Sequence, residues 1–275
     1  MFELLSSSKR NLISSSQILF EAQQRSQLIQ TWTVPKKITA ISVVVIGNGG
    51  MSGAGLSWRN DIPVTPDETL TIQFDGIGGA ATLLKRNNII LCAAGNGRIV
   101  TDLTKDTAIN GGWGGKNYSG VNDGGGNGSA GYYIASSSIG VSQTGFAGGA
   151  GGYTGNGGNS ARGVNTNGSA GTGGAGGGGA VSFVNGLMRS GTGGSVGNKG
   201  QGVSGAGGYG SLGGYLNGGT GSNGENVRYG RGHFYETARN SNSSQIYGGM
   251  ACIRIIWQGN DGKTIRSFPA FAPDY

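Results

Sequence analysis

The side chains that could perform catalysis are few and widely separated. His233 is the single histidine, and the only carboxylates between residues 111 and 250 are Asp123, Glu225 and Glu236. One histidine excludes most sites that need several imidazole ligands or a base beside a metal centre. Three scattered carboxylates give little support for the paired acids of glycoside hydrolysis. We therefore expect no enzyme activity, no cofactor and no metal.

Two glycine patterns match the dinucleotide-binding fingerprint G-x-G-x-x-G, one starting at Gly171 and the other at Gly205. Neither pattern follows a strand-like run or opens a helix, which the nucleotide site requires. Such matches arise by chance in a glycine-rich tract. Because no phosphate-loop motif GxxxxGK[ST] is present either, the sequence gives no basis for nucleotide chemistry.

Residue types suited to recognition are concentrated in the stretches between glycine runs. These stretches are rich in Tyr, Ser, Asn, Thr and Arg, which are typical of adaptable binding loops on rigid scaffolds. The longest spans residues 225–247. Tyr153, Tyr209 and Tyr215 could instead pack on the scaffold. We predict that contact with a partner comes from the following aromatic and basic residues: Trp113, Tyr118, Tyr132, Tyr133, Tyr229, Arg231, His233, Phe234 and Tyr235.

The scaffold that must hold these loops is dominated by glycine. Of the 61 glycines in 275 residues, 49 lie between residues 111 and 250, and the whole chain has only 5 prolines. Collagen is excluded because it needs abundant proline. Glycine recurs every third residue in several runs, as from Gly168 to Gly177. This period predicts polyglycine-II helices, with three residues per turn, packed side by side, since bare glycine edges let backbones hydrogen-bond closely.

An attachment module is predicted before the glycine-rich tract. A possible capping box at Ser14 and Gln17, with apolar residues at helical spacing and Pro35 as a terminator, predicts a helix around residues 18–29. Apolar, β-branched runs predict strands over three ranges. These ranges are 38–46, 69–74 and 88–93.

The end of the chain is predicted to return to this module. Residues 253–257 read as a strand that pairs beside residues 41–46 or 88–93. Cys92 and Cys252, the only cysteines, lie in apolar strand-like runs, so we expect buried free thiols. The expected domains are an α+β attachment module over 1–110, a polyglycine-II bundle over 111–250, and a returning strand and tail over 251–275.

The net charge of +7 is spread along the chain without a cluster of four or more basic residues. A nucleic-acid-binding patch is therefore not supported. No apolar run is long enough for a membrane helix or a signal peptide, so we expect synthesis in a cytoplasm.

Three sequence segments together resemble the tip adhesins of T-even-type bacteriophage long tail fibres. They are the run Val43-Val44-Val45-Ile46-Gly47-Asn48-Gly49-Gly50, the segment Trp58-Arg59-Asn60-Asp61-Ile62-Pro63-Val64-x-Pro66, and the ending Arg254-Ile255-Ile256-Trp257 with Arg266-Ser267-Phe268-Pro269. The plan of an N-terminal module followed by glycine runs and variable loops is also similar, so the resemblance covers essentially the whole chain.

The resemblance implies a receptor-recognising adhesin at the tip of the tail fibre of a virion, made in the host bacterium. One copy would cap the trimeric distal fibre protein, and distal loops would bind an outer-membrane protein or lipopolysaccharide. The modest positive charge suits an anionic cell surface. The fibre would be bound by residues of the predicted helix and its flank: Ile18, Leu19, Ala22, Ile29 and Trp32.

Two other functions remain open from the sequence. A glycine-rich ice-binding protein shares the period of three, but it needs a flat face of small residues and short turns, which the stretch 225–247 interrupts. A structural wall or silk-like protein would show a long uniform repeat, whereas the glycine phase of this chain resets between segments.

Overall fold

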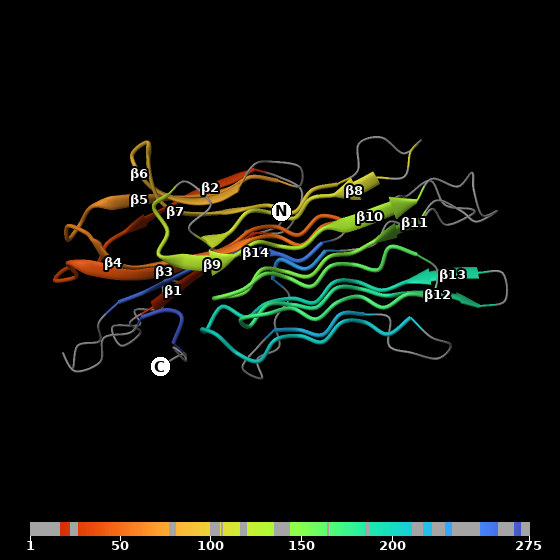
Figure 1. Ribbon diagram of the computed structural model, residues 1–275. Coiled ribbons are helices and arrows are strands. Elements are labelled where there is room, and N and C mark those ends of the chain that lie inside the picture. The colour runs from red at the N-terminus through yellow and green to blue at the C-terminus, as the bar shows by residue number, and fades with distance from the viewer. Residues whose placement is uncertain are drawn as a thin grey trace, which may run out of the picture.

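The chain forms an elongated molecule in which large strands occupy one end and glycine-rich segments run side by side toward the other (Figure 1). This computed structural model describes residues 17–22, 27–76, 81–99, 105, 107–115, 120–134, 144–163, 165–184, 187–210, 217–221, 229–232, 248–257 and 267–270. These residues form fourteen strands and no α-helix. Within the same residues, there is accordingly no helix of the length and apolarity needed to cross a membrane.

Two antiparallel sheets pack against each other at the strand-rich end. The first has the strand order β1-β14-β3-β4-β9, and the second has the order β2-β5-β6-β7. Side chains from both sheets share one core, in which Val43 and Ile253 of the first meet Leu70 and Phe74 of the second. The strands of the first sheet are β1 (Gln17–Ala22), β14 (Ala251–Ile256), β3 (Ala40–Ile46), β4 (Leu56–Pro63) and β9 (Gly124–Gly126). Those of the second are β2 (Leu28–Thr33), β5 (Thr69–Phe74), β6 (Ala81–Arg86) and β7 (Ile89–Gly95).

The predicted helix around residues 18–29 is wrong, because residues 18–22 belong to β1 and residues 28 and 29 to β2. β1 pairs with β14, Phe20 opposite Ile253, and β2 pairs with β5, Thr31 opposite Thr71. Isoleucine, threonine and aromatic residues favour a pleated, half-buried surface. Partners far along the chain therefore outweigh the weak local spacing that suggested a helix.

The predicted strands are confirmed. Residues 69–74 form β5, and β3 and β7 fall at 40–46 and 89–95. The expected return of the chain end is also found, since Ile253 of β14 pairs with Val45 of β3. β3 is buried on both faces, as its unbroken apolar run indicated.

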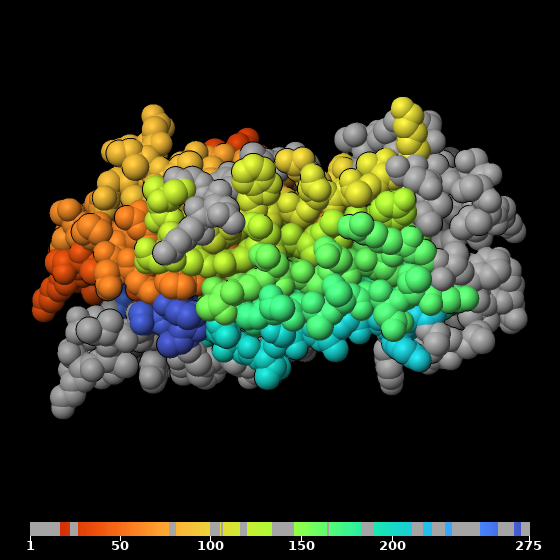
Figure 2. Space-filling view, in the orientation of Figure 1, coloured from red at the N-terminus to blue at the C-terminus, as the bar shows by residue number. Residues whose placement is uncertain are grey.

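The second face of the five-stranded sheet packs on the glycine-rich segments. Val44 and Ile46 of β3 contact a cluster that includes Tyr153, Val196 and Phe268. Figure 2 shows the two parts of the molecule in continuous contact, without a gap between the orange and green regions. The five-stranded sheet is therefore the central layer of the strand-rich end.

Both cysteines are free and buried, as predicted. Cys92 lies in the core between the sheets, and Cys252 lies on the opposite face of the first sheet. Burial raises the pKa of the Cys92 thiol, so this group stays neutral in the folded protein.

The predicted fold class, an α+β module with a bundle of packed polyglycine-II helices, is wrong. The regular secondary structure of the described residues is nearly all β, with 39% of them in strands and 1% in helix, and it forms four antiparallel sheets. The glycine-rich part contributes strands to three of these sheets. β9 extends the five-stranded sheet, β8 (Thr107–Ile109), β10 (Gly131–Ile134) and β11 (Thr144–Phe146) form another, and β12 (Val181–Val184) and β13 (Leu187–Ser190) form a hairpin. The three-residue period of glycine in the sequence did not predict these strand pairings.

Between the strands, extended glycine-rich segments are joined laterally by backbone hydrogen bonds. We call the described residues from 147 to 232, apart from β12 and β13, the glycine lattice. Gly194 N donates to Gly177 O over 2.7 Å, and Gly177 N donates to Gly219 O over 2.9 Å. An ideal Cβ built on Gly194 would lie 1.8 Å from Gly219 O. Close backbone approach thus explains the glycine content, because a side chain at such a position would overlap the carbonyl of the neighbouring segment.

Gly174 has a different role from the one that its place in the glycine period suggested. It lies in a turn with φ of 79°, and the nearest atom to an added Cβ is Gln201 Cγ at 3.1 Å. Its backbone conformation, more than contact with a neighbouring backbone, is what requires glycine there.

Candidate receptor-binding surface

Short strands and turns form the end of the molecule opposite the two large sheets. β10 pairs with both β8 and β11, and the β12–β13 hairpin lies beside them (Figure 1). We call the exposed residues carried by this end, together with the turn at residues 162–167 and Tyr209, the distal surface. Lattice segments far apart in the sequence end here next to one another, since Val181 N donates to Thr166 O and Gly168 N to Gly208 O.

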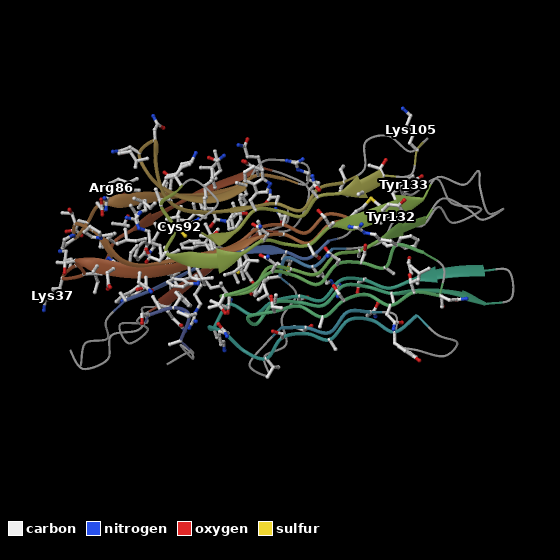
Figure 3. All side chains as sticks on the ribbon, in the orientation of Figure 1. Lys37, Arg86, Cys92, Lys105, Tyr132 and Tyr133 are labelled. Atoms are coloured by element: carbon white, nitrogen blue, oxygen red, sulfur yellow. The ribbon has the colours of Figure 1, made fainter. Side chains whose placement is uncertain are left out.

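A small apolar cluster anchors this end. Phe146, Ala161 and Val181 are buried together, and Tyr132 packs against them with its ring centroid 6.3 Å from that of Phe146. The lattice around them has few large side chains, and Figure 3 shows how sparse they are beside those of the strand-rich end. The cluster therefore fixes how β10, β11 and β12 meet.

The turn at residues 162–167 presents polar groups in a defined geometry. Thr166 Oγ1 donates to Gly163 O at 2.6 Å and accepts from Gly163 N at 3.2 Å. Asn165 takes a φ of 55°, which asparagine tolerates better than most residues. Arg162 and Asn165 are both exposed on this turn. The turn is thus held by its own side chains while its tip stays open to solvent.

Tyr209 lies beside this turn, because Gly210 N donates to Asn167 Oδ1 over 2.7 Å. The tyrosine side chain is 56% exposed. Lys105, also exposed, is labelled at the same end of the molecule in Figure 3, with Tyr132 and Tyr133. An exposed aromatic ring and two cations therefore belong to one end.

The glycine-rich half of the chain is more basic than the half that precedes it. Residues 124–257 contain seven Lys and Arg against two carboxylates, Glu225 and Glu236, which gives a net charge of +5. Residues 1–123 contain eleven Lys and Arg against nine Asp and Glu, which gives a net charge of +2. The glycine-rich half would therefore attract an anionic surface over a distance of about 10 Å at moderate salt.

Several residues predicted to contact a partner are buried or lie away from the distal surface. The Tyr133 and Tyr229 side chains are buried, and the Tyr229 hydroxyl donates to the Glu21 carboxylate on β1. Trp113 is 53% exposed, but its carbonyl accepts from Gly95 N at the end of β7, so it lies on the flank.

Of the remaining predicted residues, Tyr132 belongs to the distal surface, where its ring is partly exposed. Arg231 is partly buried and accepts through its carbonyl from Gly249 N. The other four predicted residues lie outside the described residues: Tyr118, His233, Phe234 and Tyr235.

The distal surface contains residues that the sequence reasoning did not select. Arg162 and Asn165 lie in a stretch recognised as a loop, but no single residue in it was chosen. Tyr209 was expected to be able to pack on the scaffold, and it is exposed instead. An isolated large side chain within a glycine run was the one available signal for both Arg162 and Tyr209.

Some of the residues predicted to bind the fibre are buried in the core, and others are exposed on edge strands. Ala22 and Trp32 are buried, and Trp32 stacks on Trp257 with ring centroids 5.6 Å apart. Leu19 and Ile29 are 43% and 58% exposed. Ile18 is partly buried against the same core. Among the described strands, β1 and β2 are the edge strands of their sheets, and each carries an exposed apolar side chain.

Among the described side chains, no group of three or more His, Cys, Asp or Glu residues could hold a metal ion. Comparisons of the chain with protein-family models, with curated proteins and with solved structures gave no match.

Proposed function

We propose that this protein is a receptor-binding adhesin at the tip of a T-even-type phage tail fibre, acting without catalysis. The observation that carries the proposal is the distal surface: Tyr209, Arg162 and Lys105 are all exposed at one end of a scaffold otherwise poor in large side chains. Aromatic and arginine side chains are the usual anchors of interfaces. A laterally hydrogen-bonded lattice would hold them with little loss of conformational entropy on binding.

The proposed receptor is a component of a bacterial outer membrane, either a protein or lipopolysaccharide. Residues 124–257 carry a net charge of +5, which favours an anionic cell surface. The proposed fibre attachment uses the edge strands β1 and β2, where Leu19 and Ile29 are exposed. A trimeric fibre protein could add a strand to such an edge.

Binding of fluorescently labelled full-length protein to a panel of Gram-negative cells tests this proposal. We expect saturable binding to some strains, and a loss of at least tenfold in affinity for the double variant Arg162→Glu, Tyr209→Ser. Lys36→Glu is the matched control, because it reverses an exposed charge at the strand-rich end. Protease-treated cells and cells with truncated lipopolysaccharide separate the two receptor classes.

Two results would overturn the proposal. One is the absence of saturable binding to every strain. The other is equal loss of binding in the distal double variant and in Lys36→Glu, since a general charge effect would then explain the attraction.

A further inference from the structure

A groove lies on the flank of the molecule, where β9 meets the glycine lattice, away from the distal surface. Its volume is about 370 Å³, within the range of small-molecule sites, which is roughly 300–1,000 Å³. The strand β9, whose three residues line the groove, is labelled in Figure 1. Its side-chain lining consists of two aromatic and four polar residues: Trp58, Asp123, Asn127, Tyr153, Thr154 and Asn156.

The aromatic lining is held rigidly. Trp58 Nε1 donates to Tyr153 O at 2.8 Å, and the Tyr153 hydroxyl donates to Gly197 O at 3.1 Å. Trp58 faces Gly124 across the ladder between β4 and β9, and a Cβ on Gly124 would lie 2.3 Å from the indole. The ring therefore rests on glycine backbone in one orientation, partly exposed where it lines the groove.

The polar lining presents both acceptors and donors. Asp123 Oδ2 accepts from Asn60 N at 2.8 Å, and among the described residues Oδ1 has no partner. The amide oxygens of Asn127 and Asn156 accept from Gly114 N and Asn127 N, both at 2.9 Å. These bonds orient each amide, and within the described chain neither NH2 group donates to a partner. A ligand rich in hydroxyl groups could use all three positions.

The charge of the groove narrows the chemical class of its ligand. Asp123 is the one charged side chain in the lining, and none of the described lining residues is basic. Among the described lining residues no cation offsets the Asp123 carboxylate, so an anionic ligand is disfavoured there. A flat apolar ring beside one carboxylate and two amides suits a neutral pyranose, which has an apolar C–H face and a rim of hydroxyls.

We propose that this groove binds a single neutral hexopyranose residue of a glycan, with the sugar face against Trp58 and its hydroxyls bonded to Asp123, Asn127 and Asn156. The site is separate from the distal surface, so it does not rest on the proposed function. A glycan subsite on the flank could hold one sugar of a polymer while the distal surface engages another component.

The test is an NMR titration of the full chain with methyl glycosides of glucose, galactose and mannose. We expect saturable shifts of the Trp58 indole N–H, the Gly124–Gly126 amides and the Asn127 and Asn156 side-chain amides for at least one sugar. Glucuronic acid, the anionic counterpart, should bind at least tenfold more weakly than glucose. Failure of cell binding with success of this titration would reject the adhesin proposal alone.

The matched variants are Asp123→Asn and Asp67→Asn. Asparagine at position 123 keeps the shape and the acceptor for Asn60 N, so the fold is retained, but the charge is lost. We expect about tenfold weaker binding of the neutral sugar and a smaller preference over glucuronic acid. Asp67 is exposed elsewhere with φ of 65°, which asparagine also tolerates, and its replacement should change neither quantity.

The proposal is overturned if no neutral glycoside gives saturable shifts at the groove. It is also overturned if Asp123→Asn and Asp67→Asn bind the sugar with the same affinity and the same preference over glucuronic acid.

Discussion

At Gly194 the space for a side chain is occupied by the backbone of a neighbouring segment. We predict that Gly194→Ala lowers the free energy of unfolding by about 2–3 kcal/mol, because the added methyl overlaps Gly219 O and that carbonyl already accepts from Gly177 N. The thermal midpoint should fall by roughly 5–10 °C in calorimetry. Gly163→Ala is the control, since the nearest atom to its Cβ would be 3.6 Å away. Equal stability of the two variants would contradict the close packing of the lattice.

Tyr229 contributes to the fold in this structure, although its residue type suggested recognition. Its hydroxyl donates to Glu21 on β1, and its ring is buried on the five-stranded sheet. We predict that Tyr229→Phe destabilises the protein by about 1 kcal/mol and leaves cell binding at the level of the unmodified protein. Chemical denaturation and the cell-binding assay measure the two effects. Loss of cell binding without loss of stability would return Tyr229 to the receptor contact.

Among the elements, β6 is tied to the turn before β5 by one ion pair. Arg86 donates to both oxygens of Glu68 at 2.9 Å and to Pro63 O at 2.6 Å. Partial burial raises the pKa of Glu68, but the hydrogen bonds from Arg86 and from Thr65 N, with the Arg86 charge, hold it below its ordinary value. The folded carboxylate is favoured, so this contribution to stability is present above the unfolded pKa and is lost as pH falls through the folded pKa.

The prediction for this pair is that Arg86→Gln raises the pKa of Glu68 toward the ordinary value of a glutamate. Carboxyl-carbon NMR titration measures the change directly. Replacement of Lys85, the next residue on β6, by Gln serves as the control, because its Nζ donates to Gln73 rather than to Glu68. An unchanged Glu68 pKa in Arg86→Gln would show that the guanidinium is not what lowers it.

The elements differ in how well the sequence predicts them. β3, β5, β7 and β14 are continuous apolar or alternating runs, and local patterning is sufficient to find them. β1 was mistaken for a helix because its pairing partner, β14, lies more than 200 residues further along the chain. The lattice segments consist largely of glycine and other small residues, so the sequence indicated close backbone approach without indicating which neighbours pair.

The candidate sites were predictable only in part for a similar reason. Residue type indicated that aromatic and basic side chains matter, but not whether each points inward. Tyr133 and Tyr209 have the same chemistry, yet the first is buried and the second exposed, and even Tyr132, the neighbour of Tyr133 on β10, is partly exposed. The flank groove depends on Trp58 and Asp123 meeting through the pairing of β4 with β9, which no local pattern shows.

At the scale of the whole molecule, the two ends have different surfaces. The strand-rich end carries the exposed apolar residues Leu19 and Ile29 on edge strands, and the distal end carries Tyr209 with Arg162. The lattice joins them through lateral hydrogen bonds between segments from most of the chain. Such a laterally bonded body is expected to bend little, so its two ends keep a fixed separation and orientation. It suits a protein attached at one end and binding at the other.

Hydroxyl-radical footprinting with outer-membrane vesicles from a strain bound in the cell assay tests the central claim most directly. Tyr209 reports the distal surface, Trp113 the flank, and Ile29 the edge strands, and all three side chains are more than half exposed in the free protein. The account predicts that bound vesicles protect Tyr209 from oxidation and leave Trp113 and Ile29 as reactive as before. Protection of Ile29 with no protection of Tyr209 would contradict it, because the receptor would then bind the end assigned to the fibre.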